Sequence, residues 1–240
     1  MENKSSTDNS NREQTVSGRT GVALWNSGIL LTHLLDGINI VEPKYFEGKT
    51  VLELGCGTAV AAIAASKMGA KQVYATDGNQ EVVQLAQANL KRNGIYGIQS
   101  EGDLSGEATS LRWGILDAVD YYDTADIIIG SDLTYNSGTW GLLAETFDAV
   151  LKPDGFVIYL SLAHSGFSIS GELSGFATVI ESQGHLEVLF EGSEEWPFQK
   201  VPSLDSLLKS SITSRELEVV KTTGGFKTLV LRKKRQRRSR

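Results

Sequence analysis

The chain has 240 residues, 40% of them hydrophobic, so it is long enough to bury one sizeable core. Its only cysteine, Cys56, excludes an intrachain disulfide, and no cluster of Cys and His has the spacing of metal ligands, so we expect no metal. The N-terminus lacks the apolar segment of a secretory signal, and no run approaches the roughly 18 apolar residues of a membrane span.

Apolar runs alternate with helical patterns along the chain, which predicts βαβ units on a largely parallel sheet. Residues 1–17 are polar and are interpreted as a disordered lead, and residues 191–214 fit no single pattern. The elements expected in chain order are helix 22–35 ended by Asp36-Gly37, strand 50–54, helix 59–68, strand 72–76, helix 80–92, strand 125–129, helix 140–151 stopped by residues 152–155, strand 156–160, helix 173–183, strand 185–190, and a terminal hairpin of strands 216–221 and 226–232.

Basic residues are concentrated at the C-terminus. Seven of the 23 Lys and Arg residues lie in the last nine positions, which leaves 16 basic against 29 acidic residues in the rest. Such a tail is typical of a nuclear-import signal or of a contact for RNA, membrane or an acidic partner, and a solvated end is the equal alternative. We expect a lead at 1–17, one domain at 18–232 and a basic tail at 233–240, in a monomer that is cytoplasmic and, through the tail, also nuclear.

The first chemical motif is a glycine-rich turn between a strand and a helix. It contains Gly55, Cys56 and Gly57. Glycine is needed where the backbone adopts positive φ or approaches a ligand without an intervening Cβ, and a helix N-terminus offers free N–H groups. The turn therefore indicates a nucleotide site, although an ordinary tight turn explains a bare Gly-x-Gly equally well.

Two carboxylates, Asp77 and Glu53, restrict the chemical class of the ligand. Asp77 ends the second strand, 22 positions after Gly55, close to the roughly 20 at which an acid meets ribose hydroxyls in Rossmann-type sites. A dinucleotide site would need a third glycine near position 60, where this chain has Val60. Glu53 suits a cationic ligand better than a diphosphate. S-adenosylmethionine, with its sulfonium and amino groups, is such a ligand.

Five segments stand in one order along the chain: Trp25, the Leu-Glu-Leu-Gly-Cys-Gly-Thr run at 52–58, Asp77, the Leu-Arg-Trp-Gly run at 111–114 and the Ile-Gly-Ser-Asp-Leu-Thr-Tyr run at 129–135. Together they resemble the seven-strand protein-lysine methyltransferases of methyltransferase family 16, which act on elongation factors, chaperones and calmodulin. The resemblance runs from about residue 22 to residue 160. It implies an α/β, Rossmann-like class I methyltransferase fold, with a seven-stranded, mostly parallel sheet, helices on both faces and a C-terminal antiparallel hairpin.

The resemblance also implies where S-adenosylmethionine binds. The glycine turn would lie against the methionyl part, and Asp77 would accept hydrogen bonds from the ribose hydroxyls. Trp113 would stack near the adenine, Trp25 would close the methionine end, and Ser131 would contact the cofactor through its backbone. For either tryptophan alone, core packing is the alternative. The implied cofactor residues are Trp25, Glu53, Gly55, Cys56, Gly57, Asp77, Trp113 and Ser131.

The resemblance also implies a site for the methyl acceptor. Asp132 and Tyr135, which follow a buried strand, would line a channel for a lysine side chain. Enzymes that methylate the amino group of adenine or glutamine carry two prolines here, and positions 133 and 134 are Leu and Thr. The expected function is methylation of a lysine in a protein substrate. Two alternatives stay open: a different acceptor, such as histidine, a protein N-terminus or a small molecule, or a non-catalytic binding module that recruits RNA or protein through its tail.

Overall fold

The computed structural model describes residues 21–97, 104–163, 169–201 and 203–234, and its centre is a seven-stranded sheet. The strand order is β3-β2-β1-β4-β5-β7-β6. Pairing is parallel between β1 and β2, β1 and β4, β2 and β3, and β4 and β5, whereas β7 runs antiparallel to both β5 and β6. The strands are β1 (Thr50–Leu54), β2 (Gln72–Asp77), β3 (Gly106–Ser110), β4 (Ala125–Ser131), β5 (Leu151–Leu162), β6 (Leu186–Leu189) and β7 (Phe226–Lys233).

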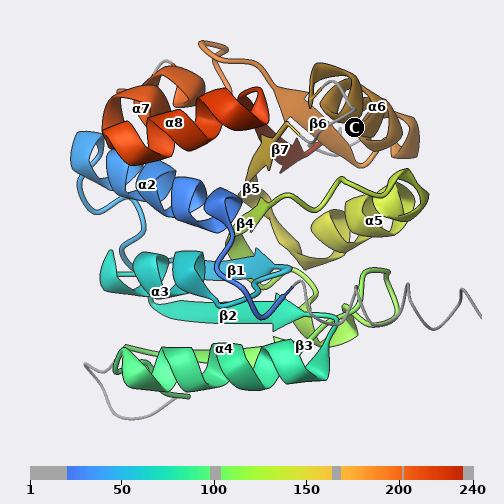
Figure 1. The fold of residues 1–240 in the computed structure, drawn as a ribbon. Coiled ribbons are helices and arrows are strands. Elements are labelled where there is room, and N and C mark those ends of the chain that lie inside the picture. The colour runs from blue at the N-terminus through green and yellow to red at the C-terminus, as the bar shows by residue number, and fades with distance from the viewer. Residues whose placement is uncertain (1–20, 98–103, 164–168, 202, 235–240) are drawn as a thin grey trace, which may run out of the picture.

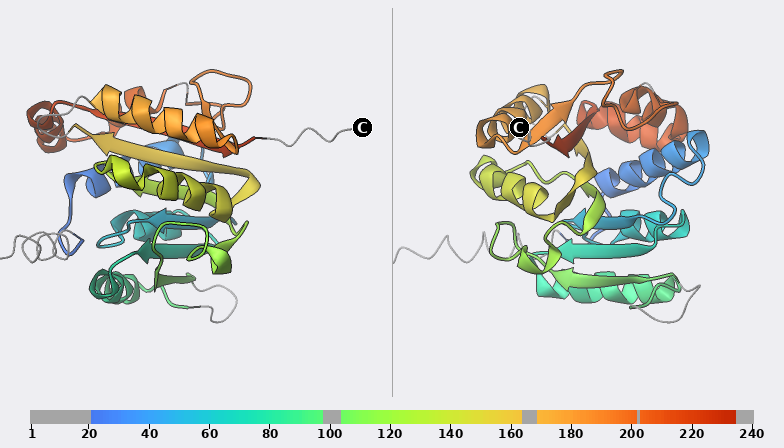
Figure 2. Two further views of the ribbon diagram at one scale, coloured as in Figure 1. Left: turned by 90° about the vertical axis from the view of Figure 1, so that its right-hand side faces the viewer. Right: turned by 180° about the vertical axis from the view of Figure 1, so that it is seen from behind.

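Helices cover both faces of this sheet (Figures 1 and 2). The described helices are α2 (Asn26–Val41), α3 (Val60–Lys67), α4 (Gln80–Arg92), α5 (Trp140–Val150), α6 (Ile169–Gln183), α7 (Leu204–Ser211) and α8 (Ser214–Thr223), with short 3-10 turns η1 (Val119–Tyr121) and η2 (Ser137–Thr139). Alternate residues of a strand face opposite sides. In β4, for example, Ile127 and Ile129 join the core beneath α2, α3 and α7, whereas Ile128 joins the core beneath α5 and α6. The predicted fold class is therefore confirmed.

The first helix differs from its prediction at both ends. It begins after Trp25, whose backbone is extended, and it continues through Gly37 to Val41. Gly37 lies inside the helix and allows a close helix contact: a Cβ there would lie 2.7 Å from the Ser211 hydroxyl oxygen on α7. Glycine in a helix interior therefore marks the close approach of α2 to α7 here, and the prediction of a stop at Asp36-Gly37 was wrong.

The C-terminal prediction was right about an antiparallel pair and wrong about one of its strands. Residues 216–221 form part of α8, which begins with a capping box between Thr213 and Glu216 and ends at Gly224 with a φ of 95°. The partners of β7 are β5 and β6, so the antiparallel pair joins segments far apart in the sequence. The unassigned stretch 191–214 contains α7, capped by the Ser203 side chain.

Two further differences concern strands. The edge strand β3 was not predicted because its residues, GEATS, form no apolar run. Strand β5 begins at Leu151 and includes Pro153 and Gly155, which the sequence assigned to a helix stop. Its register against β4 shifts between Ala125, which pairs with Leu151, and Ile127, which pairs with Phe156, so the residues between Leu151 and Phe156 interrupt the regular pairing. The remaining predicted elements agree within a few residues at their ends.

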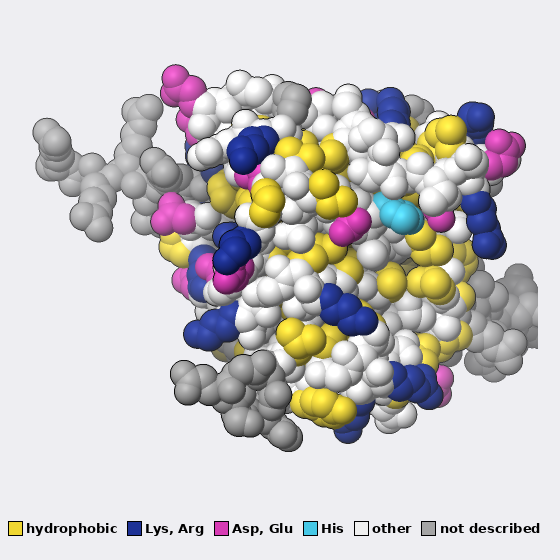
Figure 3. All heavy atoms as spheres, turned by 90° about the vertical axis from the view of Figure 1, so that its left-hand side faces the viewer, with side chains coloured by type: hydrophobic (Ala, Val, Ile, Leu, Met, Phe, Trp, Pro, Cys, Tyr) yellow, Lys and Arg dark blue, Asp and Glu magenta, His cyan; other side chains and the backbone are white. Residues whose placement is uncertain are grey.

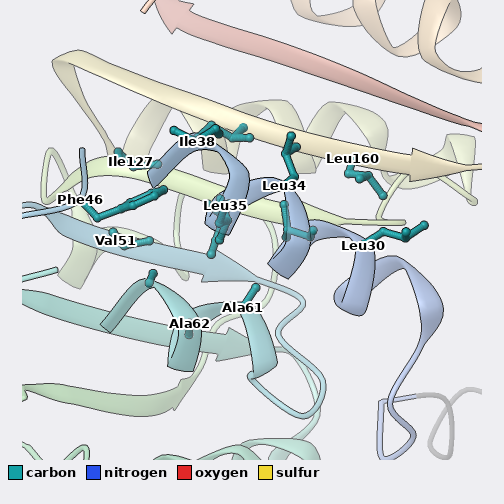
Figure 4. Packing of buried hydrophobic residues seen from close by; sticks show 14 of the residues in the cluster. Leu30, Leu34, Leu35, Ile38, Phe46, Val51, Ala61, Ala62, Ile127 and Leu160 are labelled. Atoms are coloured by element: carbon teal, nitrogen blue, oxygen red, sulfur yellow. The ribbon is translucent and has the colours of Figure 1, made fainter. Parts of the chain in front are cut away.

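Helix α2 packs against one face of the sheet through a set of buried apolar side chains. Its side chains Leu30, Leu34, Leu35 and Ile38 belong to the buried cluster that also contains the strand residues Val51, Ile127 and Leu160 (Figure 4). These four side chains are at most 1% exposed. Their burial holds α2 against the sheet.

Leu34→Ala should therefore lower the free energy of unfolding by about 2–5 kcal/mol, since it deletes a fully buried branched side chain and leaves a cavity. Denaturant unfolding measures this change. Ile40→Ala, on the same helix but 69% exposed, is the matched control and should change stability by less than about 0.5 kcal/mol. Equal losses in the two variants would contradict the assignment of Leu34 to the core.

Candidate active site

The parallel strands β1, β2 and β4 end at one edge of the sheet, and the loops that follow them surround a cavity of about 1370 Å³. Its lining includes all ten residues that the sequence singled out, which are Trp25, Glu53, Gly55, Cys56, Gly57, Asp77, Trp113, Ser131, Asp132 and Tyr135. The opposite edge, which faces the viewer in Figure 3, carries acidic and basic side chains interspersed with hydrophobic ones. The structure therefore brings the predicted residues together, while their individual roles stay predictions.

The turn after β1 has the left-handed backbone that glycine favours. Gly55 has a φ of 59° and Gly57 a φ of 51°. A Cβ on Gly55 would lie 2.5 Å from a methyl carbon of Leu133, so the missing side chain lets the loop after β4 close against the turn. A Cβ on Gly57 would lie 3.3 Å from the Gly21 carbonyl oxygen. The two glycines thus allow the turn to pack closely against the loop after β4 and against Gly21.

Asp77 ties the turn after β1 to the turn after β2. One carboxylate oxygen accepts the N–H of Gly57 at 3.3 Å, and the other accepts the N–H of Asn79 at 3.0 Å. Burial raises the pKa of Asp77, and the backbone N–H groups of Asn79, Gly57 and Gly78 oppose that increase. The carboxylate therefore faces the cavity while its orientation is set by the backbone.

Glu53 is the most deeply buried carboxyl of the cavity, with only 4% of its surface exposed. It accepts the N–H of Ala62, in the first turn of α3, at 2.9 Å. Burial raises its pKa to about 8; the Ala62 N–H lowers it and the charge of Asp77 raises it. Burial, together with Glu53 and Asp77, also raises the pKa of the Cys56 thiol. A cationic ligand would favour the ionised form of Glu53.

The aromatic residues lie at different depths. Trp25 is 55% exposed and immediately precedes α2. Trp113 is half-buried and packs against the core beneath α5 and α6. Ser131 is the last residue of β4. For Trp113 the structure thus combines core packing with a place in the cavity wall, whereas more than half of the Trp25 surface is exposed.

The loop after β4 begins at Asp132, which has a φ of 53°, unusual for a residue other than glycine. Its carboxylate accepts the Leu162 N–H at 2.7 Å, and its own N–H donates to the Leu160 carbonyl at 3.0 Å. Asp132 is therefore fastened to the end of β5, a contact that sequence reasoning did not foresee. Tyr135, three residues on, is 70% exposed.

Sequence reasoning missed several residues of the cavity wall. Asn79, Gln80 and Val82 come from the start of α4, and Arg112 precedes Trp113. The available signal was Asn79, whose side chain caps α4 by accepting the Glu81 N–H at 2.9 Å. Leu133 was quoted only as part of a motif, and its contact with Gly55 depends on two loops far apart in the sequence.

The ends of the chain lie mostly outside the described residues, including the predicted lead 1–17 and residues 235–240 of the basic tail. Arg232 and Lys233 belong to β7 and pair with acidic groups: Arg232 Nε lies 2.5 Å from Glu187, and Lys233 Nζ lies 2.5 Å from Asp123. Two of the seven clustered basic residues are thus engaged by the domain itself.

Within residues 21–97, 104–163, 169–201 and 203–234, no group of three or more His, Cys, Asp or Glu residues could hold a metal ion. None of the helices in that part of the chain is long and apolar enough to cross a membrane.

The buried Glu53 predicts a pH dependence of stability. Its folded-state pKa of about 8 lies above the ordinary value of 4.5, so the folded state holds the proton more tightly. The corresponding stability is fully present below pH 4.5 and is lost as the pH rises through about 8. Glu53→Gln, which stays neutral, should flatten this decline in denaturant unfolding across that range. Glu81→Gln, at an exposed position on α4, should keep the wild-type profile; a wild-type slope in Glu53→Gln would contradict the buried neutral carboxyl.

Known proteins provide an independent comparison. The sequence model of a family described as "Lysine methyltransferase" matches residues 4–167. Over 112 residues the chain is 33% identical to a calmodulin-lysine N-methyltransferase of Arabidopsis thaliana, covering 46% of this chain and 36% of that protein. Over 65 residues it is 45% identical to a ribosomal protein L11 methyltransferase of Thermotoga petrophila, covering 27% of this chain and 25% of that one. The chain thus spans well under half the length of these curated relatives.

Solved structures agree in fold. A TehB-like SAM-dependent methyltransferase from Corynebacterium glutamicum has a TM-score of 0.52 at 16% identity, covering 93% of this chain and 94% of its own. The ribosomal protein L11 methylase of Lactobacillus delbrueckii has a TM-score of 0.51 at 23% identity, covering 84% and 77%. The fold is that of class I methyltransferases, and with the family match it confirms S-adenosylmethionine as the expected cofactor. Because the family match covers most of the chain, this protein belongs to the lysine methyltransferase family.

Proposed function

We propose that this chain transfers a methyl group from S-adenosylmethionine to a lysine side chain of a protein substrate. The observation that carries the proposal is that the turn suited to the cofactor and the loop suited to the acceptor line one cavity. Its volume of about 1370 Å³ exceeds the roughly 300–1,000 Å³ typical of small-molecule sites, which leaves room for a second reactant. The lysine methyltransferase family supports lysine as the acceptor.

The residues of the cavity fit the cofactor. Gly55 and Gly57 contribute only backbone to the cavity wall, and the carboxylates of Glu53 and Asp77 suit a ligand with positive charge and hydroxyl groups. We propose that Asp77 accepts hydrogen bonds from the ribose hydroxyls of S-adenosylmethionine and that Glu53 faces the positive charge of the cofactor. Trp113 offers a flat apolar surface to the adenine.

S-adenosylmethionine, when bound, supplies a methyl group on a positively charged sulfur that is a good leaving group. The chain must then present a neutral lysine amine, although with an ordinary pKa near 10.4 only roughly one amine in a few thousand is neutral at pH 7. Tyr135, at the rim of the cavity, provides an aromatic wall that shields the amine from water and so favours its neutral form. Asp132, held on β5 through Leu162, orients the amine by accepting a hydrogen bond.

The direct test is to incubate cell extract with the purified protein and methyl-labelled S-adenosylmethionine, and to locate the label by mass spectrometry. Label on lysine supports the proposal. Label on arginine, histidine, an N-terminus or a small molecule would replace lysine by that acceptor, and an extract that stays unlabelled would favour a binding module.

Asp77→Ala should weaken S-adenosylmethionine binding at least about tenfold, because hydrogen bonds to a charged group contribute about 1.5–3 kcal/mol each and 1.4 kcal/mol is a factor of ten. Calorimetry on the purified variant measures the affinity. The matched control is Glu81→Ala, which removes an equal charge from an exposed position outside the cavity wall and should bind normally. Unchanged affinity in Asp77→Ala would remove this residue from the cofactor site.

Tyr135→Ala should reduce methyl transfer about a hundredfold while cofactor affinity and melting temperature stay near wild type, since the side chain is exposed and acts on alignment of the acceptor. Label incorporation and calorimetry are measured on one preparation. Phe190→Ala removes another aromatic side chain of similar exposure, 73%, that is not among the lining residues of the cavity, and it should keep full activity. Full activity in Tyr135→Ala would reject the acceptor role.

A further inference from the structure

We infer that Thr134 is a positioning residue, which fixes the conformation of the loop that presents Asp132 and Tyr135 to the acceptor. This inference deepens the proposed function and rests on it. It arises from a set of buried hydrogen bonds behind the cavity wall. Thr134 is only 1% exposed, whereas Tyr135 beside it is 70% exposed, so the loop turns from the core to the cavity between these two residues.

Each polar group of Thr134 is bonded to a different element of the fold. Its N–H donates to the Tyr159 hydroxyl on β5 at 3.1 Å. Its carbonyl accepts the indole N–H of Trp140, at the start of α5, at 2.8 Å. Its hydroxyl donates to the carboxylate of Glu172 on α6. Three separate elements therefore hold one residue, and the loop can change its path only by breaking buried hydrogen bonds.

The direction of these hydrogen bonds follows from the lone pairs of Tyr159. Its oxygen accepts the N–H groups of Leu133 at 2.8 Å and of Thr134 at 3.1 Å, which occupies both lone pairs. Its own proton must then point to the Thr134 hydroxyl oxygen, 2.9 Å away, and the Thr134 hydroxyl in turn donates a hydrogen bond to the Glu172 carboxylate. The hydrogen bonds thus run in one direction, from Tyr159 to Thr134 and from Thr134 to the Glu172 carboxylate. The Thr134 hydroxyl accepts one hydrogen bond and donates the other, which the methyl groups of a valine could not do.

Packing supports the same arrangement. Gly175 on α6 lies so close to Trp140 that a Cβ there would be 2.8 Å from a ring carbon. The Trp140 ring also meets the Phe176 ring edge-on at a centroid distance of 6.2 Å. The donor for the Thr134 carbonyl is therefore held in place by α6, the helix that supplies Glu172. On the cavity side, Leu133 packs against Gly55, and this contact is independent of the Thr134 hydroxyl.

A matched control exists on β5. Ser161 donates to the same Glu172 oxygen at 3.3 Å and is fully buried, and none of its hydrogen bonds that the structure describes reaches the loop 132–135. Loss of either hydroxyl removes one hydrogen bond to the Glu172 carboxylate, but only Thr134→Val removes a hydrogen bond that holds the loop. Thr134→Ser keeps the hydroxyl and serves as the rescue.

The test measures three quantities on each full-length variant: label transfer from methyl-labelled S-adenosylmethionine to proteins of cell extract, cofactor affinity by calorimetry, and amide hydrogen exchange of the peptide containing residues 132–135. Thr134→Val should slow transfer about tenfold or more, because misalignment costs rate, while cofactor affinity changes less than about twofold. Its loop amides should exchange faster. Thr134→Ser and Ser161→Ala should transfer and exchange like wild type.

Wild-type transfer and exchange in Thr134→Val, or losses in Ser161→Ala as large as those in Thr134→Val, would overturn the inference. If Thr134→Val fails to fold, Tyr159→Phe provides a second route, since it deletes the acceptor of both loop N–H groups and should give the same slower transfer and faster exchange. A wild-type protein that transfers no label refutes the proposed function separately, and the exchange comparison between Thr134→Val and Ser161→Ala then decides whether Thr134 holds the loop.

Discussion

The parallel pairing of β1 with both β2 and β4 is the constraint on which the site depends. Leu54 lies opposite Thr76 on one side and Gly130 on the other, so the three strands reach the sheet edge together. The residues that follow them, from the glycine turn, Asp77 and the loop at Asp132, must then share one cavity. Without this register the same motifs would lie too far apart to contact one ligand.

Polar groups buried at this edge give the loops their definite shape. An unsatisfied buried polar group costs about 1–3 kcal/mol, so each such group restricts the conformations available to its neighbours. Asp77 joins two turns through backbone N–H groups, and Tyr159 and Glu172 hold Thr134. Loop 132–135 therefore rests on hydrogen bonds supplied by β5, α5 and α6, whereas Asp77 is held by the turns after β1 and β2.

Much of the fold could be predicted because its parallel half is built from local patterns. Strand β1 and helix α4 agree with their predicted bounds, since an apolar run and an amphipathic period are visible within a few residues. The C-terminal part is different. The apolar and β-branched residues of 216–221 suit a strand, but the capping box at Thr213 and packing against the body make them a helix. The edge strand β3, with few apolar residues, exists through its pairing with β2.

The sequence by itself determined the family, the order of the central βα units and ten of the residues that line the cavity, because these depend on motifs within short segments. Only the tertiary structure decided which residues support them. The bond of Asp132 to Leu162, the burial that raises the pKa of Glu53, and the clamp on Thr134 all join positions distant along the chain. The physical reason is that burial and hydrogen-bond partners are properties of packed elements, and no local pattern of residue types specifies which elements will meet.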